Sequence, residues 1–370
     1  MFTAADPVPG GGGLSEVRVV HPVVALEAGA FRVVRARATI NLEGLTIPAG
    51  ELTPGAWGEG FVDRRHPHTY VHELMLTVQD RMGGAKGAVS LSAGKGFAPF
   101  GTDDPMMRPP LRYPVNHHLA QILERAVVIG ALRLGPLTAE AGLFNGDEPE
   151  RPSQWPRVGG RFGDSWSARL TAAPRPDIEL QVSHARVRSP EHRPGAGTDQ
   201  VKWSLSAASS LPIAGEPVEL LAEWARTSEA EGFFVFHTLL AEGAWRRGPH
   251  RLLFRLERTE RPEEERRSFF RARRPHLENS ILGTTRWTIQ TVGYDVAVGS
   301  VGPVRVRPLA EVSYGRIAKV GGGLFSVDEL YGRGHFWSVS VGLRVGAGAA
   351  MPRMGRYGAA VGPAVPHHLH

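Results

Sequence analysis

The chain of 370 residues contains no cysteine, which excludes a disulfide framework, thiolate metal sites and a cysteine nucleophile. It also lacks any run approaching about 18 apolar residues, which argues against a transmembrane helix. No Gly-x-Ser-x-Gly element, phosphate loop or nucleotide fingerprint is present. Ser183 and His184 are adjacent, so strand alternation would send them to opposite faces. We therefore expect no enzymatic activity and no cofactor.

The chain does contain repeated segments in which polar and apolar residues alternate. The clearest are Val34–Glu43, Val304–Arg316 and His335–Gly346. A period of two predicts β-strands, because successive side chains leave opposite faces of the pleat. Counting residues 31–43 as the first, fourteen segments alternate in this way, the others being 70–80, 86–94, 122–134, 137–145, 163–173, 177–188, 200–210, 217–227, 232–243, 250–260, 283–296, 304–316 and 335–346.

The connections between these segments alternate between short and long. Long ones lie at 44–69, 95–121, 146–162, 189–199, 261–282 and 317–334, and the connection at 228–231 is the one short exception in that series. Short periplasmic turns and long extracellular loops produce this pattern in bacterial outer-membrane barrels, whereas a soluble β-sandwich has no reason to produce it. We predict an all-β protein, namely a transmembrane antiparallel up-and-down β-barrel of 14–16 strands in the outer membrane.

The ends of the chain divide it into three parts. We expect residues 1–17 to be a flexible N-terminal segment, residues 18–346 to form the barrel, and residues 347–370 to form a C-terminal tail that either extends into the periplasm or folds into the lumen. Residues 18–27 add a fifteenth strand, so either a sixteen-stranded barrel lacks its first strand or a fourteen-stranded barrel carries an extra N-terminal segment. No signal-peptide pattern is visible, so we expect a partial or mature form.

The predicted lumen is rich in charge. Alternation projects into it a set of residues that we expect to line a pore, namely Arg35, Arg37, Glu73, Arg169, Lys202, Glu223, Arg251, Arg255, Arg286, Arg305, Arg307, Glu311 and Arg344. Isolated buried charges are costly, so this many require either water or mutual pairing. A wet channel and a salt-bridged, plugged lumen are the two interpretations. On the outer face we expect Trp166, Trp203, Trp224, Trp287 and Trp337.

The net charge of +6 comes almost entirely from arginine, since lysine occurs only at positions 86, 95, 202 and 319. The basic residues form no stripe and no nucleic-acid motif, so we expect no nucleic-acid partner. A cationic lumen that favours anions explains the charge better. We predict a porin-like protein that lets small, anionic solutes diffuse passively. Its expected partners are outer-membrane lipid or lipopolysaccharide and these solutes. A homo-oligomer is compatible with this, although no interface is identifiable.

One short element supports the barrel. The sequence Gly94-Lys95-Gly96-Phe97-Ala98-Pro99-Phe100-Gly101 resembles the Gly-Lys/Arg…Pro-Phe-Gly element of phosphate-selective porins and related barrels. Glycines at a strand end let the backbone turn, and the two phenylalanines would anchor at the membrane interface. The element supports the barrel more than it supports phosphate as a solute.

The histidines suggest an alternative function. His66 and His68 lie in Asp63–His68, and Met106-Met107 precede the pair His117-His118. Imidazole and thioether groups suit copper, and imidazole also suits zinc.

Over about residues 18–346, the chain resembles a family of bacterial outer-membrane barrels. The family carries Asp-Arg-x-His-Pro-His, paired-His, Phe-Asn-Gly-x-Glu-Pro and Ser-Pro-Glu elements, which here are Asp63–His68, His117-His118, Phe144–Pro149 and Ser189–Glu191. Relatives often occur beside metal- and copper-resistance functions, which implies a role in envelope metal traffic. The alternative is thus a plugged barrel that binds metal or a partner through its loops, with His66, His68, His117 and His118 as ligands. Packing and hydrogen bonding within the loops explain the same histidines without a metal.

Overall fold

The computed structural model describes residues 1–7, 12–17, 19–20, 22–31, 33–42, 45, 69–80, 87–108, 110, 112–115, 117–147, 149, 152–156, 158–188, 198–264, 281–321, 326–348 and 351–362. None of the helices formed by these residues is long and apolar enough to cross a membrane. The short helices are η2 (Pro105–Met107), α2 (His117–Ala120), η3 (Ala230–Gly232), α3 (Val327–Tyr331) and η4 (Gly358–Ala360).

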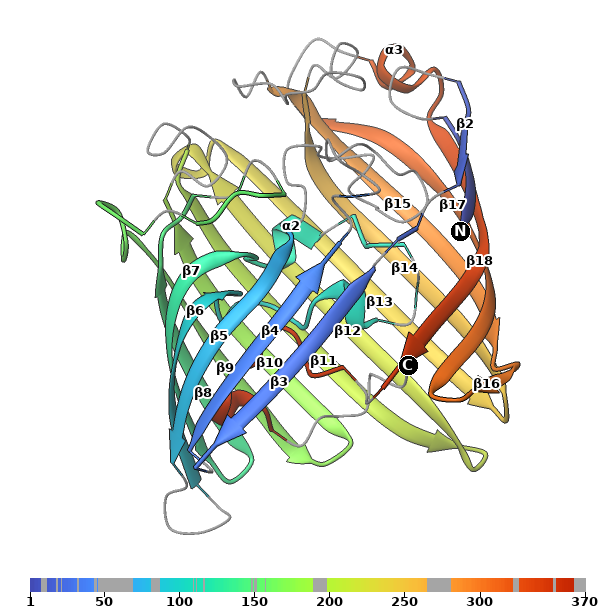
Figure 1. Cartoon of the computed structure of the whole chain (residues 1–370). Helices are drawn as coiled ribbons and strands as arrows, with labels where there is room; N and C mark the ends of the chain where they lie inside the picture. Colours follow the sequence, from blue (N-terminus) through green and yellow to red (C-terminus); the bar gives the residue numbers. More distant parts are fainter. Residues whose placement is uncertain are drawn as a thin grey trace.

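Most of the described residues form a single antiparallel sheet that curves into a barrel (Figure 1). Its strands are β1 (Phe2–Asp6), β2 (Leu14–Val17), β3 (Val23–Ala30), β4 (Val34–Asn41), β5 (Val71–Asp80), β6 (Gly87–Gly96), β7 (Arg125–Leu134), β8 (Leu137–Phe144), β9 (Ser165–Arg175), β10 (Ile178–Val187), β11 (Gln200–Ile213), β12 (Glu216–Glu229), β13 (Phe234–Arg247), β14 (His250–Glu264), β15 (Ile281–Val296), β16 (Gly299–Val301), β17 (Val304–Gly321) and β18 (His335–Ala347). From β3 to β18 each strand pairs with its neighbour in sequence, with the short β16 set beside β17. The predicted all-β, up-and-down architecture is confirmed.

Alternating burial shows which face of each strand is the inner one. In β8, for example, Thr138, Glu140 and Phe144 are buried, while Leu137 and Leu143 are exposed. The same pattern puts polar and charged residues inside and leucine, valine and aromatic residues outside on most strands, as expected for a wall between lipid and lumen. The alternation visible in the sequence therefore corresponds to the two faces of the barrel wall.

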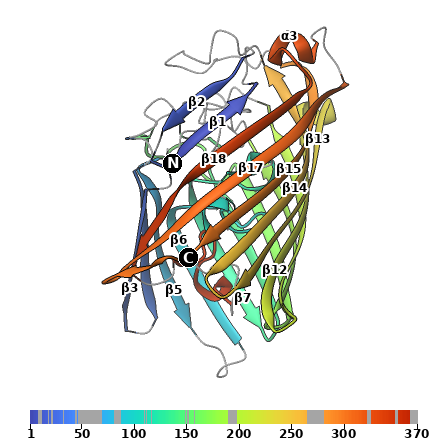
Figure 2. The same ribbon diagram turned by 90° about the vertical axis from the view of Figure 1, so that its right-hand side faces the viewer.

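The first residues of the chain belong to the sheet, where the sequence had suggested a flexible segment. β1 pairs with the upper part of β18, from Phe2 beside Val341 to Asp6 beside Trp337, and β2 pairs with β1 (Figure 2). Together with β16, these two strands bring the sheet to eighteen strands, above the 14–16 predicted. Among the described residues no pairing joins β3 to β2 or β18, so the sheet is not closed there.

One expected orientation is wrong. Trp287, predicted on the outer face, is 1% exposed and points inward, where its ring packs against Tyr331 and Phe336. Its neighbour Arg286 therefore lies on the outer face, where it pairs with Glu260 at 2.6 Å, and it is not a lumen residue. The period-two pattern gives two faces but does not say which one is inner. On β15 the inner face carries Trp287 and Ile289, which pack in a buried apolar cluster.

Two segments from distant parts of the sequence occupy the inside of the barrel. The first is the connection between β6 and β7, residues 97–124, which carries η2 and α2 and is called the luminal loop below. The second is residues 351–362, which follow β18, turn back into the barrel and include η4 (Figure 1). We call it the C-terminal plug. Of the two fates expected for the tail, folding into the lumen is the one observed for this part.

Candidate functional site

The luminal loop crosses the barrel from β6 and β7 to the strands opposite. Thr102 donates to Glu223 on β12 at 2.5 Å, and Arg108 donates to Glu242 on β13 at 3.2 Å. Farther along, Arg112 donates to Glu257 on β14 at 2.9 Å. Because the two ends of the loop connect to β6 and β7, these hydrogen bonds fix the loop across the lumen.

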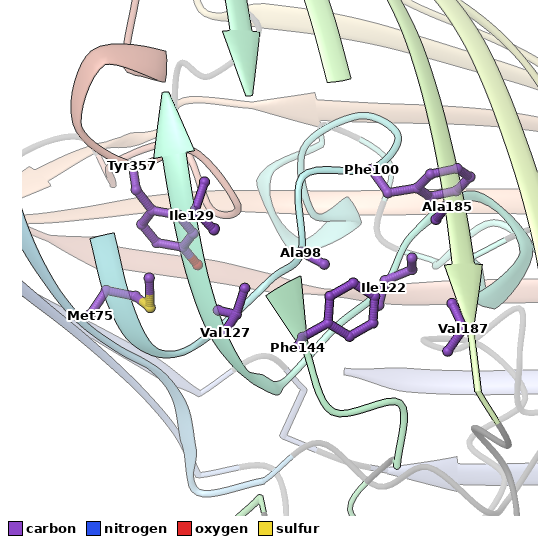
Figure 3. Packing of buried hydrophobic residues seen from close by; sticks show 10 residues of the cluster. All are labelled: Met75, Ala98, Phe100, Ile122, Val127, Ile129, Phe144, Ala185, Val187 and Tyr357. Atoms are coloured by element: carbon purple, nitrogen blue, oxygen red, sulfur yellow. The ribbon is translucent and has the colours of Figure 1, made fainter. Parts of the chain in front are cut away.

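Apolar packing fixes the near end of the same loop against the wall (Figure 3). Ala98, Phe100 and Ile122 of the loop contact inward residues of β5, β7, β8 and β10, among them Phe144, which is completely buried. Tyr357 of the C-terminal plug belongs to the same cluster. This apolar cluster keeps water away from the inner side of the wall in the described state, because loop and plug side chains cover it.

The C-terminal plug is held by two buried arginines. Arg353 donates to both Asp103 oxygens, at 2.5 and 3.0 Å, and to both Glu179 oxygens, at 2.8 Å each. Arg356 reaches Asp103 at 3.0 Å and Glu140 at 3.3 Å. Since Asp103 lies in the luminal loop while Glu179 and Glu140 lie on β10 and β8, the two arginines tie the plug, the loop and the wall into one network.

The wall also recognises the backbone of the plug. Arg37 on β4 donates to the carbonyl oxygens of Arg353 and Arg356, at 2.8 and 2.9 Å. Arg169 on β9, which forms a bidentate pair with Glu140 at 2.7 Å, donates to the Gly355 carbonyl at 2.9 Å. Bonds to backbone atoms need one fixed path of the chain, so the plug adopts a defined conformation and does not merely fill space.

Two glycines in the plug are required by that conformation. Gly355 has φ +78° and Gly358 has φ +54°, values that side-chain-bearing residues seldom adopt. A Cβ atom at Gly358 would lie 2.3 Å from the Ser90 hydroxyl on β6, and one at Gly355 would lie 2.9 Å from the Phe97 ring. Any other residue at either position would therefore have to push the plug away from the wall.

A tyrosine completes the attachment. The Tyr357 hydroxyl donates to Glu73 on β5 at 2.6 Å and accepts the Phe97 backbone N–H at 3.1 Å. Burial and the adjacent Glu73 carboxylate raise the pKa of Tyr357 well above its ordinary value, so the phenol keeps its proton. For Arg353, burial alone would lower the pKa, but the carboxylates of Asp103 and Glu179 outweigh it and raise the pKa. Both groups are thus held in the protonation state that the plug requires.

A separate buried cluster joins the two ends of the luminal loop to β5. His72 lies 2.5 Å from Glu124 through Nδ1 and 3.4 Å from Asp104 through Nε2, and Lys95 lies 3.9 Å from Glu124. Lys95 also donates to Thr69. Lys95, which opens the element that resembles phosphate-selective porins, is therefore occupied with anchoring the loop.

The four histidines proposed as metal ligands are only partly visible. His66 and His68 lie outside the described residues, as does the side chain of His118. His117 is 1% exposed and its ring lies 5.2 Å from that of Tyr113 within the luminal loop. In the part of the chain that the structure describes, no group of three or more His, Asp or Glu side chains could hold a metal ion.

Most of the residues predicted to line a pore do face inward, and most are covered. Their buried members are Arg37, Glu73, Arg169, Lys202, Glu223, Arg251, Arg255 and Glu311. Arg35 and Arg305 are exposed, and Arg307 and Arg344 are partly exposed. Buried basic and acidic side chains are nearly equal in number among the described residues, twelve Lys or Arg against thirteen Asp or Glu. The covered interior therefore carries no excess of positive charge.

The sequence did not single out Arg353, Arg356 or Tyr357, although the plug depends on them. A signal was present, because two arginines three residues apart alternate with glycines in a tail that follows the last strand. Without the structure, this pattern is indistinguishable from a solvated terminus. Asp103, their partner in the luminal loop, was equally inconspicuous beside Asp104.

Comparison with known proteins connects the fold to bacterial outer-membrane porins. No family model and no curated protein sequence matches the chain. Among solved structures, it is similar to an anion-selective porin from Comamonas acidovorans, with a TM-score of 0.54 and 9% identity over 94% of this chain and 96% of that one. It is also similar to in-vitro folded OmpT, an outer-membrane protein of Vibrio cholerae, with a TM-score of 0.50 and 11% identity over 93% and 95% of the two chains. At such low identity the likeness establishes a porin-like β-barrel fold and nothing about the solute.

Proposed function

We propose that this protein is an outer-membrane channel for small solutes, closed in the described state by its own C-terminal plug and luminal loop. The observation that carries the proposal is the pair Arg353 and Arg356, which tie a terminal segment to loop and wall inside a porin-like barrel. The fold supports an outer-membrane location, since exposed apolar residues alternate with inward polar ones around the wall.

The plug is better suited to leave the lumen than the luminal loop is. The plug joins the barrel covalently at one described end, after β18, whereas the loop is fixed at both ends by β6 and β7. Its attachments combine ion pairs and hydrogen bonds, which water can replace once the segment withdraws, with the apolar contacts of Met354, Tyr357, Ala359 and Ala360. Withdrawal would break no strand pairing, so the barrel would remain folded. The channel therefore opens by displacement of residues 351–362.

The preference for anions would come from the mouth at the short-turn side. Arg305, Arg307 and Arg344 lie there on β17 and β18, with at least part of each side chain exposed. Arg307 also donates a hydrogen bond to Asp295 on β15, and Asp295 accepts another from Arg251 on β14. Exposed arginines at a channel mouth raise the local concentration of anions. Small anionic solutes are accordingly the substrate class that we propose.

Planar-bilayer recording tests this function. The full chain is compared with a variant truncated after Gly348 and with the double variant Arg353→Gln/Arg356→Gln, under a salt gradient. We expect rare openings from the full chain, frequent openings from both variants, and a reversal potential shifted toward the anion. Changing Arg305 and Arg307 to Glu should reduce that shift. Heat-modified mobility in gels confirms that each variant is folded.

A second function is favoured by the extent of burial in the lumen. If the barrel stays closed permanently, it acts through its loops, as a binder of metal or of a partner protein. A folded, truncated barrel that never conducts would support this second function and reject the channel. Titration of the silent protein with Cu²⁺ or Zn²⁺, and of a variant with His66 and His68 replaced by Gln, would then test the proposed ligands.

A further inference from the structure

The outer face of the barrel carries an asymmetric distribution of charge. On β12, β14 and β17, the run of outward apolar residues gives way to an arginine toward the long-loop end of the strand, and outward arginines also lie at this end of β10 and β15. These five residues, called the basic belt, are Arg186, Arg226, Arg258, Arg286 and Arg316. In three of the strands the outward residue two positions nearer the middle is apolar or aromatic, namely Trp224, Leu256 and Tyr314.

Strand register places the members of the basic belt close to one another. Arg226 on β12 lies beside His237 on β13. Arg258 on β14 lies beside Thr288 on β15, which lies beside Arg316 on β17, and Arg316 lies beside His335 on β18. Neighbouring strands are about 4.8 Å apart. Arginine or histidine thus occupies neighbouring positions on β12 and β13, and aligned positions on β14, β17 and β18, at the edge of the apolar surface.

Few acidic groups accompany them. Glu260 forms an ion pair with Arg286 at 2.6 Å. Asp199 forms an ion pair with Arg188 at 2.6 Å and a longer one with Arg186 at 3.7 Å. No ion pair involving Arg226, Arg258 or Arg316 is present among the described residues, and His237, Arg258, Arg316 and His335 are exposed. The belt therefore presents more positive charge than its acidic neighbours balance.

The described part of β4 to β9 lacks such a belt. On β4 to β9 the outward residues near the long-loop end include Ile40, Leu143 and Trp166, and no outward Lys or Arg follows the apolar run in the described part of these strands. The cations are therefore concentrated on one side of the barrel and at one edge of its apolar surface. General solubility would not require this placement, because the surrounding loops already carry charge.

We propose that the basic belt binds the phosphate groups of anionic lipid in the outer leaflet, with lipopolysaccharide as the ligand. Long arginine side chains at the edge of an apolar surface extend toward the headgroups while their stems remain in the hydrocarbon. Arginine also forms paired hydrogen bonds to phosphate oxygens. A second copy of the chain is a poorer occupant, because two such belts would repel each other across an interface. The inference rests on the outer-membrane location proposed above, and not on conduction.

The test uses the whole purified protein in detergent and measures bound lipopolysaccharide by native mass spectrometry and by titration. The triple variant Arg226→Gln/Arg258→Gln/Arg316→Gln is compared with a matched control, Arg175→Gln/Arg247→Gln, which removes exposed arginines at the short-turn side. Each basic residue near an anionic lipid surface strengthens binding by about fivefold. We therefore expect about a hundredfold weaker binding for the triple variant, little change for the control, and a steep loss with salt.

Two further arms make the outcome decisive. Dephosphorylated lipopolysaccharide should bind the wild type as weakly as intact lipopolysaccharide binds the triple variant, and inorganic phosphate should compete only weakly. Equal binding by wild type and triple variant, or an equal loss in the control variant, would overturn the proposal. A dimer or trimer that dissociates in the triple variant, with lipid binding unchanged, would assign the belt to an interface between copies. Bilayer conductance is recorded separately, so failure of the channel would not count against the belt.

Discussion

Replacement of Arg353 by Gln should release the C-terminal plug while leaving the barrel folded. Arg353 makes four hydrogen bonds to Asp103 and Glu179, all within a buried site. Removal of one partner from a buried ion pair costs about 3–5 kcal/mol, because the remaining charge stays desolvated. Arg356 also contacts both carboxylates, at 3.0 and 3.5 Å, and compensates in part.

The lower end of that range, about 3 kcal/mol, is therefore the appropriate magnitude, and it corresponds to roughly a 150-fold change in the ratio of docked to released plug. Hydrogen exchange measures this ratio directly. The Gly355 N–H donates to Glu73 and the Ala359 N–H donates to Ser90, so both amides are protected only when the plug is docked. Protection of the peptide 351–362 should fall by about a hundredfold in the variant.

The matched control is Arg175→Gln, which removes an exposed arginine paired with Asp177. Exposed pairs contribute about 0–1 kcal/mol, so exchange in the plug should not change. The reasoning is refuted if Arg353→Gln leaves protection of residues 351–362 unchanged while the strands stay protected. It is also refuted if exchange rises equally in strands and plug, because the arginine would then stabilise the barrel as a whole.

Three further results should follow from the same attachments. Gly358→Ala should expose the plug to exchange, because an alanine at positive φ costs about 1–2 kcal/mol even before its Cβ meets Ser90; normal protection would show that this contact can relax. Raising the pH above about 10, the ordinary pKa of tyrosine, should loosen the plug: docking raises the pKa of Tyr357, so its stabilising contribution is complete below that pH and is lost as the pH rises toward the docked value. Tyr357→Phe should abolish this alkaline loss in bilayer or exchange measurements, and an unchanged alkaline transition would implicate other groups. Glu257→Gln should increase exchange at the Val115 amide, because Glu257 accepts from both Arg112 and the Val115 N–H, at 2.9 and 2.7 Å, and a charged acceptor contributes about 1.5–3 kcal/mol; unchanged exchange there would place the anchor of the loop elsewhere.

The sequence predicted the wall well and its contents poorly, for a physical reason. Strand alternation and loop length are local properties, so Arg169 could be assigned to the inner face before any pairing was known. Its bidentate pair with Glu140 is equally local, since β8 and β9 are adjacent. The partners of Arg353, in contrast, lie 250 and 174 residues away along the chain, at Asp103 and Glu179. No short-range pattern specifies such a contact.

The same distinction explains the reversed orientation on β15. A wet lumen would have required polar residues inward, and on that assumption Arg286 was expected inside and Trp287 outside. Protein covers the inner side of this strand near Trp287, because the buried cluster around Trp287 includes Val115 of the luminal loop and Tyr331 of α3, whose ring centre lies 5.3 Å from that of Trp287. Once the interior is packed, hydrophobicity no longer distinguishes lipid from lumen, and the phase of a strand becomes ambiguous from sequence alone.

The position of the plug after β18, the last strand of the sheet, bears on the order in which the molecule assembles. Its contacts are with Glu73, Glu140 and Glu179, on strands made long before it, and the Tyr357 hydroxyl bonds a residue 284 positions earlier. Such distant contacts form late, since the intervening chain must already be arranged. We therefore expect the sheet to form while its interior is still hydrated, and docking of the plug to expel that water afterwards. Completion of the sheet and sealing of its interior would then be separate events, and the plug could dock only after the strands that bind it are in place.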